Sequence, residues 1–125
     1  MVRRLIAATA MASLAAACGS DGNGMPPSPP PAGSTITITS SGVSPKNLVV
    51  SPGTQVTFVN NDSRNHEMTS DPHPEHTDCP AINTVDLVVP GMSKQTGNLN
   101  AVRACGYHDH VLFTNTSLQG TISVQ

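Results

Sequence analysis

From about residue 34 onward, apolar and polar residues alternate with a period of two rather than 3.6. Ile36 and Ile38 are separated by threonines, which is typical of a strand with one buried face. Similar short apolar runs follow along the chain, and turn residues such as Pro, Gly and Asn separate them. The pattern predicts strands around residues 36–38, 48–50, 55–60, 86–89, 93–99, 101–107 and 120–124.

The segments between these runs predict turns and loops rather than helices. No stretch has helical periodicity, and only residues 114–118 are expected to form a helical turn. Residues 71–80 contain too much proline and charge for a strand, so we expect a loop there. Seven or eight short strands with frequent turn signals predict an all-β fold, an antiparallel β-sandwich.

The N-terminal segment has a different composition, and it predicts export. Residues 1–18 carry two arginines followed by an alanine-rich apolar run, too short for a permanent membrane span and typical of a signal peptide. The run ends in Leu14-Ala15-Ala16-Ala17-Cys18-Gly19, which resembles a bacterial lipobox. This predicts cleavage before Cys18 and lipidation of its thiol. Ordinary secretory cleavage after an Ala-x-Ala sequence is the alternative.

Residues 19–34 are rich in Pro, Ser and Gly and predict an extended spacer without a core of its own. Residues 35–125 then form one small domain, whose size makes a disulfide or a metal a useful addition to its stability. We therefore expect a lipoprotein anchored to a membrane by its N-terminal lipid. Its domain would face the periplasm or the cell exterior.

The charge balance narrows the choice of partners. The chain has six Lys and Arg against eight Asp and Glu, and removal of Arg3 and Arg4 with the signal leaves a formal charge of −4. No basic patch remains, so a nucleic acid is not an expected partner. Half of the acids lie among the histidines, where they either attract a cation or form an ordinary solvated loop: Glu67, Asp71, Glu75 and Asp78.

The five histidines fall into two clusters that suggest a metal site. Residues 103–110 contain Cys105, His108, Asp109 and His110. The other cluster lies in the polar segment before residue 80 and consists of His66, His73 and His76. Imidazole and thiolate ligands select copper or zinc, so the clusters predict one metal site. The alternative is a set of solvated loop histidines.

Together these segments resemble the cupredoxins, the plastocyanin-like blue copper family, over residues 35–125. The resemblance rests on Leu48-x-Val50-x-Pro52-Gly53-x-x-Val56-x-Phe58-x-Asn60-x-Asp62 followed by His66, and on the last strand 120–124. It implies an antiparallel Greek-key β-sandwich with copper at one end, used mainly to carry electrons. The family's usual ligands are a histidine from the earlier strand, then a cysteine, a second histidine and a weak methionine from the last loop.

The last loop can be aligned with the family in two ways. The first uses the plastocyanin-type spacing Cys105-x-x-His108 and makes Cys105 a copper thiolate. However, no methionine follows Met92. This alignment also places Arg103 where the family points an aromatic side chain into the core, and a buried, unpaired arginine is costly.

The second alignment counts back from residues 118–120. It places Asp109 where the thiolate would be, Tyr107 at the aromatic core position, and Cys105 one step further along the same inward face. Cys79 is then the partner of Cys105 in a disulfide, because exported chains form disulfides readily. Closing a loop of about 26 residues would stabilise the domain by roughly 3 kcal/mol.

With Cys105 in a disulfide, the site would be built from imidazoles. His66, His108 and His110 are the expected ligands, and His73 or His76 is a weaker candidate. The carboxylate of Asp109 is expected to accept the second ring N–H of a ligand histidine. Nitrogen ligation suits Cu(II) or Zn(II), and the intense blue colour of a copper thiolate would be missing.

The sequence therefore predicts a copper-binding, cupredoxin-like lipoprotein for electron transfer or copper handling outside the cytoplasm. Zinc is the alternative metal if the site is all-histidine. The expected partners are the membrane, through the lipid anchor, and a redox or copper-exchange protein. A metal-free β-sandwich interaction domain at the cell surface is the alternative function. No Ser-His-Asp order, paired-carboxylate motif or phosphate loop is present, so we do not expect an enzyme.

Overall fold

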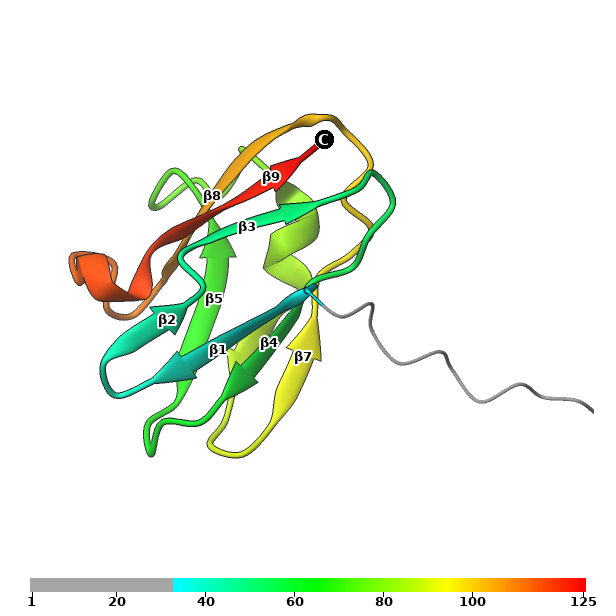
Figure 1. Cartoon of the computed structure of the whole chain (residues 1–125). Helices are drawn as coiled ribbons and strands as arrows, with labels where there is room; N and C mark the ends of the chain where they lie inside the picture. Colours follow the sequence, from blue (N-terminus) through cyan, green and yellow to red (C-terminus); the bar gives the residue numbers. More distant parts are fainter. Residues whose placement is uncertain (1–32) are drawn as a thin grey trace, which may run out of the picture.

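The computed structural model describes residues 33–125, which form two β-sheets packed against each other (Figure 1). The predicted export signal, the lipidation site Cys18 and nearly all of the predicted spacer lie outside the described residues. Within residues 33–125, no helix is long and apolar enough to cross a membrane.

One sheet has four strands and the other has five. The four-stranded sheet has the order β2-β1-β4-β7 and consists of β1 (Thr35–Thr39), β2 (Gly42–Ser44), β4 (Thr57–Asn60) and β7 (Ser93–Gln95). The five-stranded sheet has the order β3-β9-β8-β5-β6 and consists of β3 (Asn47–Val50), β5 (His66–Ser70), β6 (Asp86–Val88), β8 (Arg103–Asp109) and β9 (Gly120–Val124). Two short 3₁₀ segments, η1 (Pro80–Thr84) and η2 (Thr116–Leu118), complete the described elements.

The β-sandwich predicted from the alternating pattern is confirmed. In β1 the two isoleucines are fully buried and the threonines between them are not, as a strand with one core face requires. The pairing is mixed rather than purely antiparallel, because β1 pairs with β4 and β3 pairs with β9 in parallel. An apolar pattern identifies a strand but does not encode the direction of its neighbour.

The sequence pattern missed β5, which lies between β8 and β6 in the five-stranded sheet. Its residues His-Glu-Met-Thr-Ser contain one strongly apolar side chain, so no alternation was visible. Neighbouring strands on both sides complete its backbone hydrogen bonds and hold it in the sheet. The loop predicted over residues 71–80 is confirmed up to the start of η1, and η2 forms the helical turn predicted near residue 116.

The core between the sheets is aliphatic around a single aromatic pair. Phe58 of β4 and Tyr107 of β8 meet edge to face, with ring centroids 5.2 Å apart. Aliphatic and thioether side chains fill the surrounding space, including Ile36, Ile38, Val56, Met68, Ile82, Val88, Leu118 and Ile122. Tyr107 thus holds the aromatic core position that the second alignment assigned to it.

Strand β8 separates the core from His108, because its two faces have different neighbours. Cys105, Tyr107 and Asp109 alternate along the strand and are buried on the core side. His108 therefore points to the opposite, outer face of the five-stranded sheet. The loop between β5 and η1 covers it there and leaves it only 3% exposed.

Candidate metal centre

Four histidine side chains meet on the outer face of the five-stranded sheet. Each offers one ring nitrogen, and these nitrogens all lie within 4.8 Å of one another in the cluster His73, His76, His108 and His110. The first two come from the loop between β5 and η1, and the other two come from the end of β8 and the residue after it. We call this set the four-histidine cluster.

The register between β5 and β8 places the two later histidines. Thr69 pairs with His108 across the strands, so both side chains lie on the outer face. The hydroxyl oxygen of Thr69 is 3.4 Å from Nε2 of His108. The amide of His110 donates to the carbonyl of Glu67 at 2.7 Å, which continues the pairing beyond the end of β8. His110 therefore lies beside His108 on the same face.

Hydrogen bonds fold the loop so that its histidines face the strand. The amide of Asp78 donates to the carbonyl of Asp71 at 2.8 Å, which closes the loop at its base. The side chain of Asn83 donates to the carbonyl of His76 at 2.8 Å and accepts from the amide of Ser70 at 2.9 Å. His76 itself has a positive φ of 52°, a conformation that costs energy outside glycine. The loop is thus held in one shape by its own backbone.

Two of the rings have hydrogen bonds that fix their tautomers. Nδ1 of His108 lies 2.6 Å from a carboxylate oxygen of Asp71, and Nδ1 of His76 lies 2.8 Å from the carbonyl oxygen of Ser70. Because both partners only accept, each Nδ1 carries the proton and each Nε2 keeps a lone pair. Nε2 of His76 is 2.9 Å from Nδ1 of His110. The lone pair of His76 is therefore directed at another ring of the cluster, whereas that of His108 lies beside the hydroxyl of Thr69.

Gly106 allows Asp71 to reach His108. A Cβ atom at Gly106 would collide with the carboxylate of Asp71, so a larger residue would displace that side chain. The amide of Asp71 also donates to the carbonyl of Gly106 at 3.0 Å. In the sequence, Asp71 stood out only as an acid able to attract a cation, and no pattern singled out Gly106.

His73 is the ring whose environment most favours a metal. It stacks on Phe113 with centroids 4.0 Å apart and planes 4° apart. Its Nδ1 is buried and has no hydrogen-bond partner among the described residues, an arrangement that costs free energy unless something binds there. Removal of water around the ring is the main cause that lowers the pKa of His73. Electrostatic interaction with the nearby rings of His110, His108 and His76 lowers it further. A neutral imidazole is the form that coordinates a metal.

The cluster fits copper or zinc by its donor chemistry. Four imidazole nitrogens without a thiolate suit Cu(II) or Zn(II), which both accept imidazole ligands. The carboxylate of Asp71 behind His108 is the kind of outer partner that orients a ligand histidine. The unpartnered Nδ1 of His73 is consistent with this assignment.

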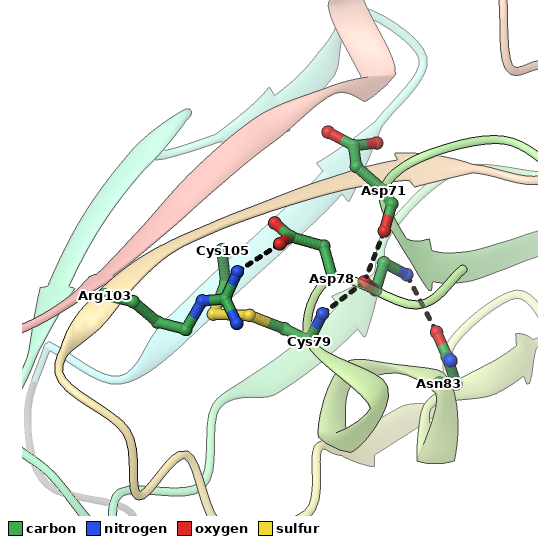
Figure 2. The surroundings of a disulfide bond; sticks show 7 residues. Asp71, Asp78, Cys79, Asn83, Arg103 and Cys105 are labelled. Atoms are coloured by element: carbon green, nitrogen blue, oxygen red, sulfur yellow. Dashed lines mark hydrogen bonds and ion pairs between the residues drawn. A yellow bond between two sulfur atoms is a disulfide. The ribbon is translucent and has the colours of Figure 1, made fainter. Parts of the chain in front are cut away.

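Cys105 is bonded to Cys79 and is not a free thiolate (Figure 2). The sulfur atoms are 2.03 Å apart and the Cα atoms 5.7 Å apart, within the normal range for a disulfide. The pairing expected from the second alignment is thus present in the structure. Arg103 is half-exposed and forms an ion pair with Asp78, so it does not enter the core as the first alignment would require.

His66 does not join the cluster that it was expected to form. It lies on the core side of β5, with its Nδ1 2.6 Å from Asp109 and its Nε2 3.0 Å from Asp62. The ring is fully buried and both nitrogens are engaged by carboxylates. These carboxylates lie at opposite edges of the ring, so one ion cannot contact both of them and a ring nitrogen together. The cluster of described histidines therefore contains the two loop histidines and not His66.

Asp109 also has a different place from the expected one. One of its oxygens contacts His66, and the other accepts the amides of Val111 and Leu112 at 2.9 and 3.1 Å. It contacts neither His108 nor His110, because neighbouring residues on a strand point to opposite faces. Asp71 contacts a cluster histidine in its place. The alternation of β8 was the signal that could have excluded Asp109 from this role.

The other carboxylate at His66 is part of a small charge network. Burial raises the pKa of Asp62, but hydrogen bonds from His66, Arg64 and the amide of Ser63 outweigh this effect and lower it to about 2. The guanidinium of Arg64 is 2.9 Å from the carboxylate. Asp62 is therefore ionised at neutral pH and holds His66 from the side opposite Asp109.

Comparison with known proteins gives a match to solved structures. No protein-family model and no curated protein sequence matches the chain. A purple cupredoxin from Nitrosopumilus maritimus is 20% identical with a TM-score of 0.55, over 74% of this chain and 99% of that one. Plastocyanin from Dryopteris crassirhizoma is 15% identical with a TM-score of 0.56, over 73% and 99% of the two chains.

A larger protein contains the same fold as one part. The Cu-containing nitrite reductase from Thermus scotoductus SA-01 is 19% identical with a TM-score of 0.54, and the match covers 73% of this chain but 22% of that one. These structures share the arrangement of strands with residues 33–125. The described domain is therefore a β-sandwich of the cupredoxin fold.

Proposed function

From the cupredoxin fold and the four-histidine cluster, we propose that this protein binds one copper ion and handles copper outside the cytoplasm. The single observation that carries the proposal is the convergence of four ring nitrogens within 4.8 Å. His73, His76, His108 and His110 would hold the ion, and zinc is the other metal that this donor set accepts. When bound, copper supplies an exchangeable cation that can also change its oxidation state.

The position of the cluster favours uptake and transfer of the ion. Three of its histidines are partly exposed, in contrast to the buried His108. Asp71 contacts His108, Glu75 acts electrostatically on His73, and Glu67 shares the outer face of β5 with Thr69. This negative charge attracts a cation and repels an anionic substrate. We therefore favour a copper carrier over an enzyme.

Electron transfer through the same ion is the second candidate function. It needs ligands that move little between Cu(I) and Cu(II), and the hydrogen bonds at His76 and His108 restrict these two rings. The two functions separate in a kinetic experiment. Fast electron exchange with retained copper indicates electron transfer, whereas passage of copper to a competing chelator without a redox step indicates copper handling.

A titration of the purified protein with Cu(II) tests metal binding directly. We expect one tightly held ion per chain, nitrogen hyperfine structure in the electron paramagnetic resonance spectrum and no intense visible band, because the thiolate is absent. Failure to bind one ion stoichiometrically would favour the metal-free interaction domain. A deep blue product would reinstate Cys105 as a ligand.

The proposed cellular position follows from the N-terminal sequence. A lipid on Cys18 would anchor the domain to a membrane, facing the periplasm or the cell exterior, and a redox or copper-exchange protein would be its protein partner. Cys18→Ser should release the protein from the membrane fraction or block its maturation. An unchanged membrane-bound form would contradict lipidation at this residue.

A further inference from the structure

The disulfide joins the two segments that supply the four histidines. Cys79 is the last residue of the loop that carries His73 and His76. Cys105 lies on β8, the strand that carries His108, and is three residues before it. The disulfide therefore links the β5–η1 loop covalently to β8, and its sulfur atoms are not part of the four-histidine cluster.

A cavity of about 250 Å³ lies beside this disulfide. Both cysteines line it, together with the apolar side chains of Pro80 and Leu99. Arg103 and Asp78 also line it, and their ion pair lies beside the disulfide in Figure 2. Both cysteines are nearly buried, but Cys79, 6% exposed, is nearer to solvent than Cys105, 2% exposed, so we take Cys79 as the point of attack.

We propose that the Cys79–Cys105 disulfide is a site of thiol–disulfide exchange, and that its reduction by a dithiol weakens metal binding by the four-histidine cluster. This inference rests on the proposed function, since it concerns the same metal site. It adds a reactant, a dithiol, and a route by which the bound ion is released.

The exchange proceeds in two balanced steps. A thiolate of the dithiol attacks Sγ of Cys79, forms a mixed disulfide with it and expels the thiolate of Cys105, which takes up a proton. The second thiol of the dithiol then loses its proton and attacks the dithiol's first sulfur, which is bonded to Sγ of Cys79. Cys79 leaves as a thiolate and is protonated. Two electrons pass from the dithiol, which becomes a disulfide, and the protein gains two thiols.

Reduction loosens the loop but does not remove all of its restraints. The amide of Cys79 still donates to the hydroxyl of Ser70 at 2.8 Å, and Asn83 still bridges Ser70 and His76. The reduced loop therefore samples more conformations, and binding a metal must order it again. We expect affinity to fall about tenfold, the size usual when outer support of a metal site is lost.

The first experiment compares the full chain with the double variant Cys79→Ala/Cys105→Ala, using Zn(II), which has no redox chemistry of its own. Zinc affinity is measured by competition with an indicator after circular dichroism has verified folding. Leu48→Ala, in β3 at the far edge of the sheet, serves as a matched destabilised control. We expect about tenfold weaker zinc binding in the double variant only. Equal affinity in a folded double variant would overturn the proposal.

The second experiment uses the unmodified protein, so it stands even if the double variant does not fold. Coupling between two sites is reciprocal, so saturating Zn(II) should shift disulfide reduction by a small dithiol about tenfold toward the oxidised form. Alkylation and mass spectrometry measure the fraction reduced. The variant His76→Ala/His110→Ala is the control for zinc that binds to the dithiol instead of the protein. In this variant Zn(II) should not protect the disulfide from reduction.

The outcomes distinguish this inference from the proposed function. If the wild-type protein binds no Zn(II) or Cu(II), the metal site itself is wrong. If it binds metal but zinc does not protect the disulfide, the coupling is wrong and the metal site stands. Reduction that occurs no faster than global unfolding would show that the cavity does not admit a thiol, and would overturn the exchange site.

Discussion

Nδ1 of His66 lies 2.6 Å from Oδ2 of Asp109, and neither side chain is exposed to solvent. The other ring nitrogen of His66 is 3.0 Å from Asp62. Both ring nitrogens of His66 are therefore engaged by buried carboxylates. A buried histidine held between two carboxylates thus occupies the place where the cupredoxin resemblance led us to expect a copper ligand, and the histidines suited to a metal gather on the other face of the sheet.

This pair leads to a prediction about stability rather than metal binding. His66→Ala leaves the buried carboxylates of Asp62 and Asp109 without their common partner, which should lower the free energy of unfolding by about 3–5 kcal/mol. Urea unfolding of the metal-free protein measures the loss. His73→Ala is the matched control, because His73 is partly exposed and should change the metal-free stability little. Similar losses in the two variants would contradict the structural role of His66.

Metal binding should depend on the histidines of the cluster. His76→Ala and His110→Ala each remove one of two ring nitrogens that lie 2.9 Å apart, so each should weaken Cu(II) binding at least about tenfold. Isothermal titration with a competing chelator measures the affinity. Glu75→Gln removes an exposed charge from the same loop without removing a ligand, and its effect should be smaller. Equal, small losses in all three variants would indicate nonspecific binding.

The contact between Asp71 and β8 predicts an effect of a single methyl group. Gly106→Ala places a Cβ atom against the carboxylate of Asp71 and should separate it from His108. Copper affinity should then fall about tenfold, as it does when an outer carboxylate is removed. Asp71→Asn provides the comparison, because the amide keeps the size but weakens the hydrogen bond. If Gly106→Ala binds copper like the wild type, Asp71 does not support the site.

Much of the fold follows from the sequence because strand burial has a clear period. Ile36 and Ile38 identify β1, and the alternation of Cys105 and Tyr107 gives the buried face of β8. Strand direction and β5 do not follow from it, since parallel pairing and a polar central strand leave no apolar pattern. These features are decided by neighbouring strands that are distant in sequence.

The sequence predicts the type of side chain in the site, but not which histidines form it. The sequence correctly separates the disulfide cysteines from the imidazoles once Tyr107 is assigned to the core. It does not reveal that Asp62 and Asp109 engage both nitrogens of His66, because that depends on three segments meeting. The same limit applies to His73 and His76, whose proline-rich loop gave no sign of folding over β8.

The charge network around Asp62 predicts an acid-sensitive component of stability. Its pKa is about 2 in the folded protein and 3.8 in an unfolded chain, so the carboxylate stabilises the fold fully above pH 3.8. That contribution disappears as the pH falls from 3.8 toward about 2. Urea unfolding across this range should show a shallower decline for Asp62→Asn than for the wild type. Parallel decline of the two proteins would show that Asp62 is not perturbed.

The stacking of His73 on Phe113 predicts how the cluster responds to pH. Desolvation and the neighbouring histidines hold the pKa of His73 below 6.5, so this ring stays neutral, and able to bind metal, to a lower pH than a free histidine. Phe113→Ala removes the ring stacked at 4.0 Å and lets water reach the imidazole. Because water stabilises the charged form, the pKa of His73 should rise toward 6.5, and proton competition should weaken metal binding at mildly acidic pH.

A titration of the metal-free protein, followed through the imidazole C–H resonances, measures the shift. The exposed Val111→Ala serves as the control and should leave the pKa unchanged. A pKa of His73 that stays the same or falls in Phe113→Ala would show that the aromatic ring does not exclude water from this ligand.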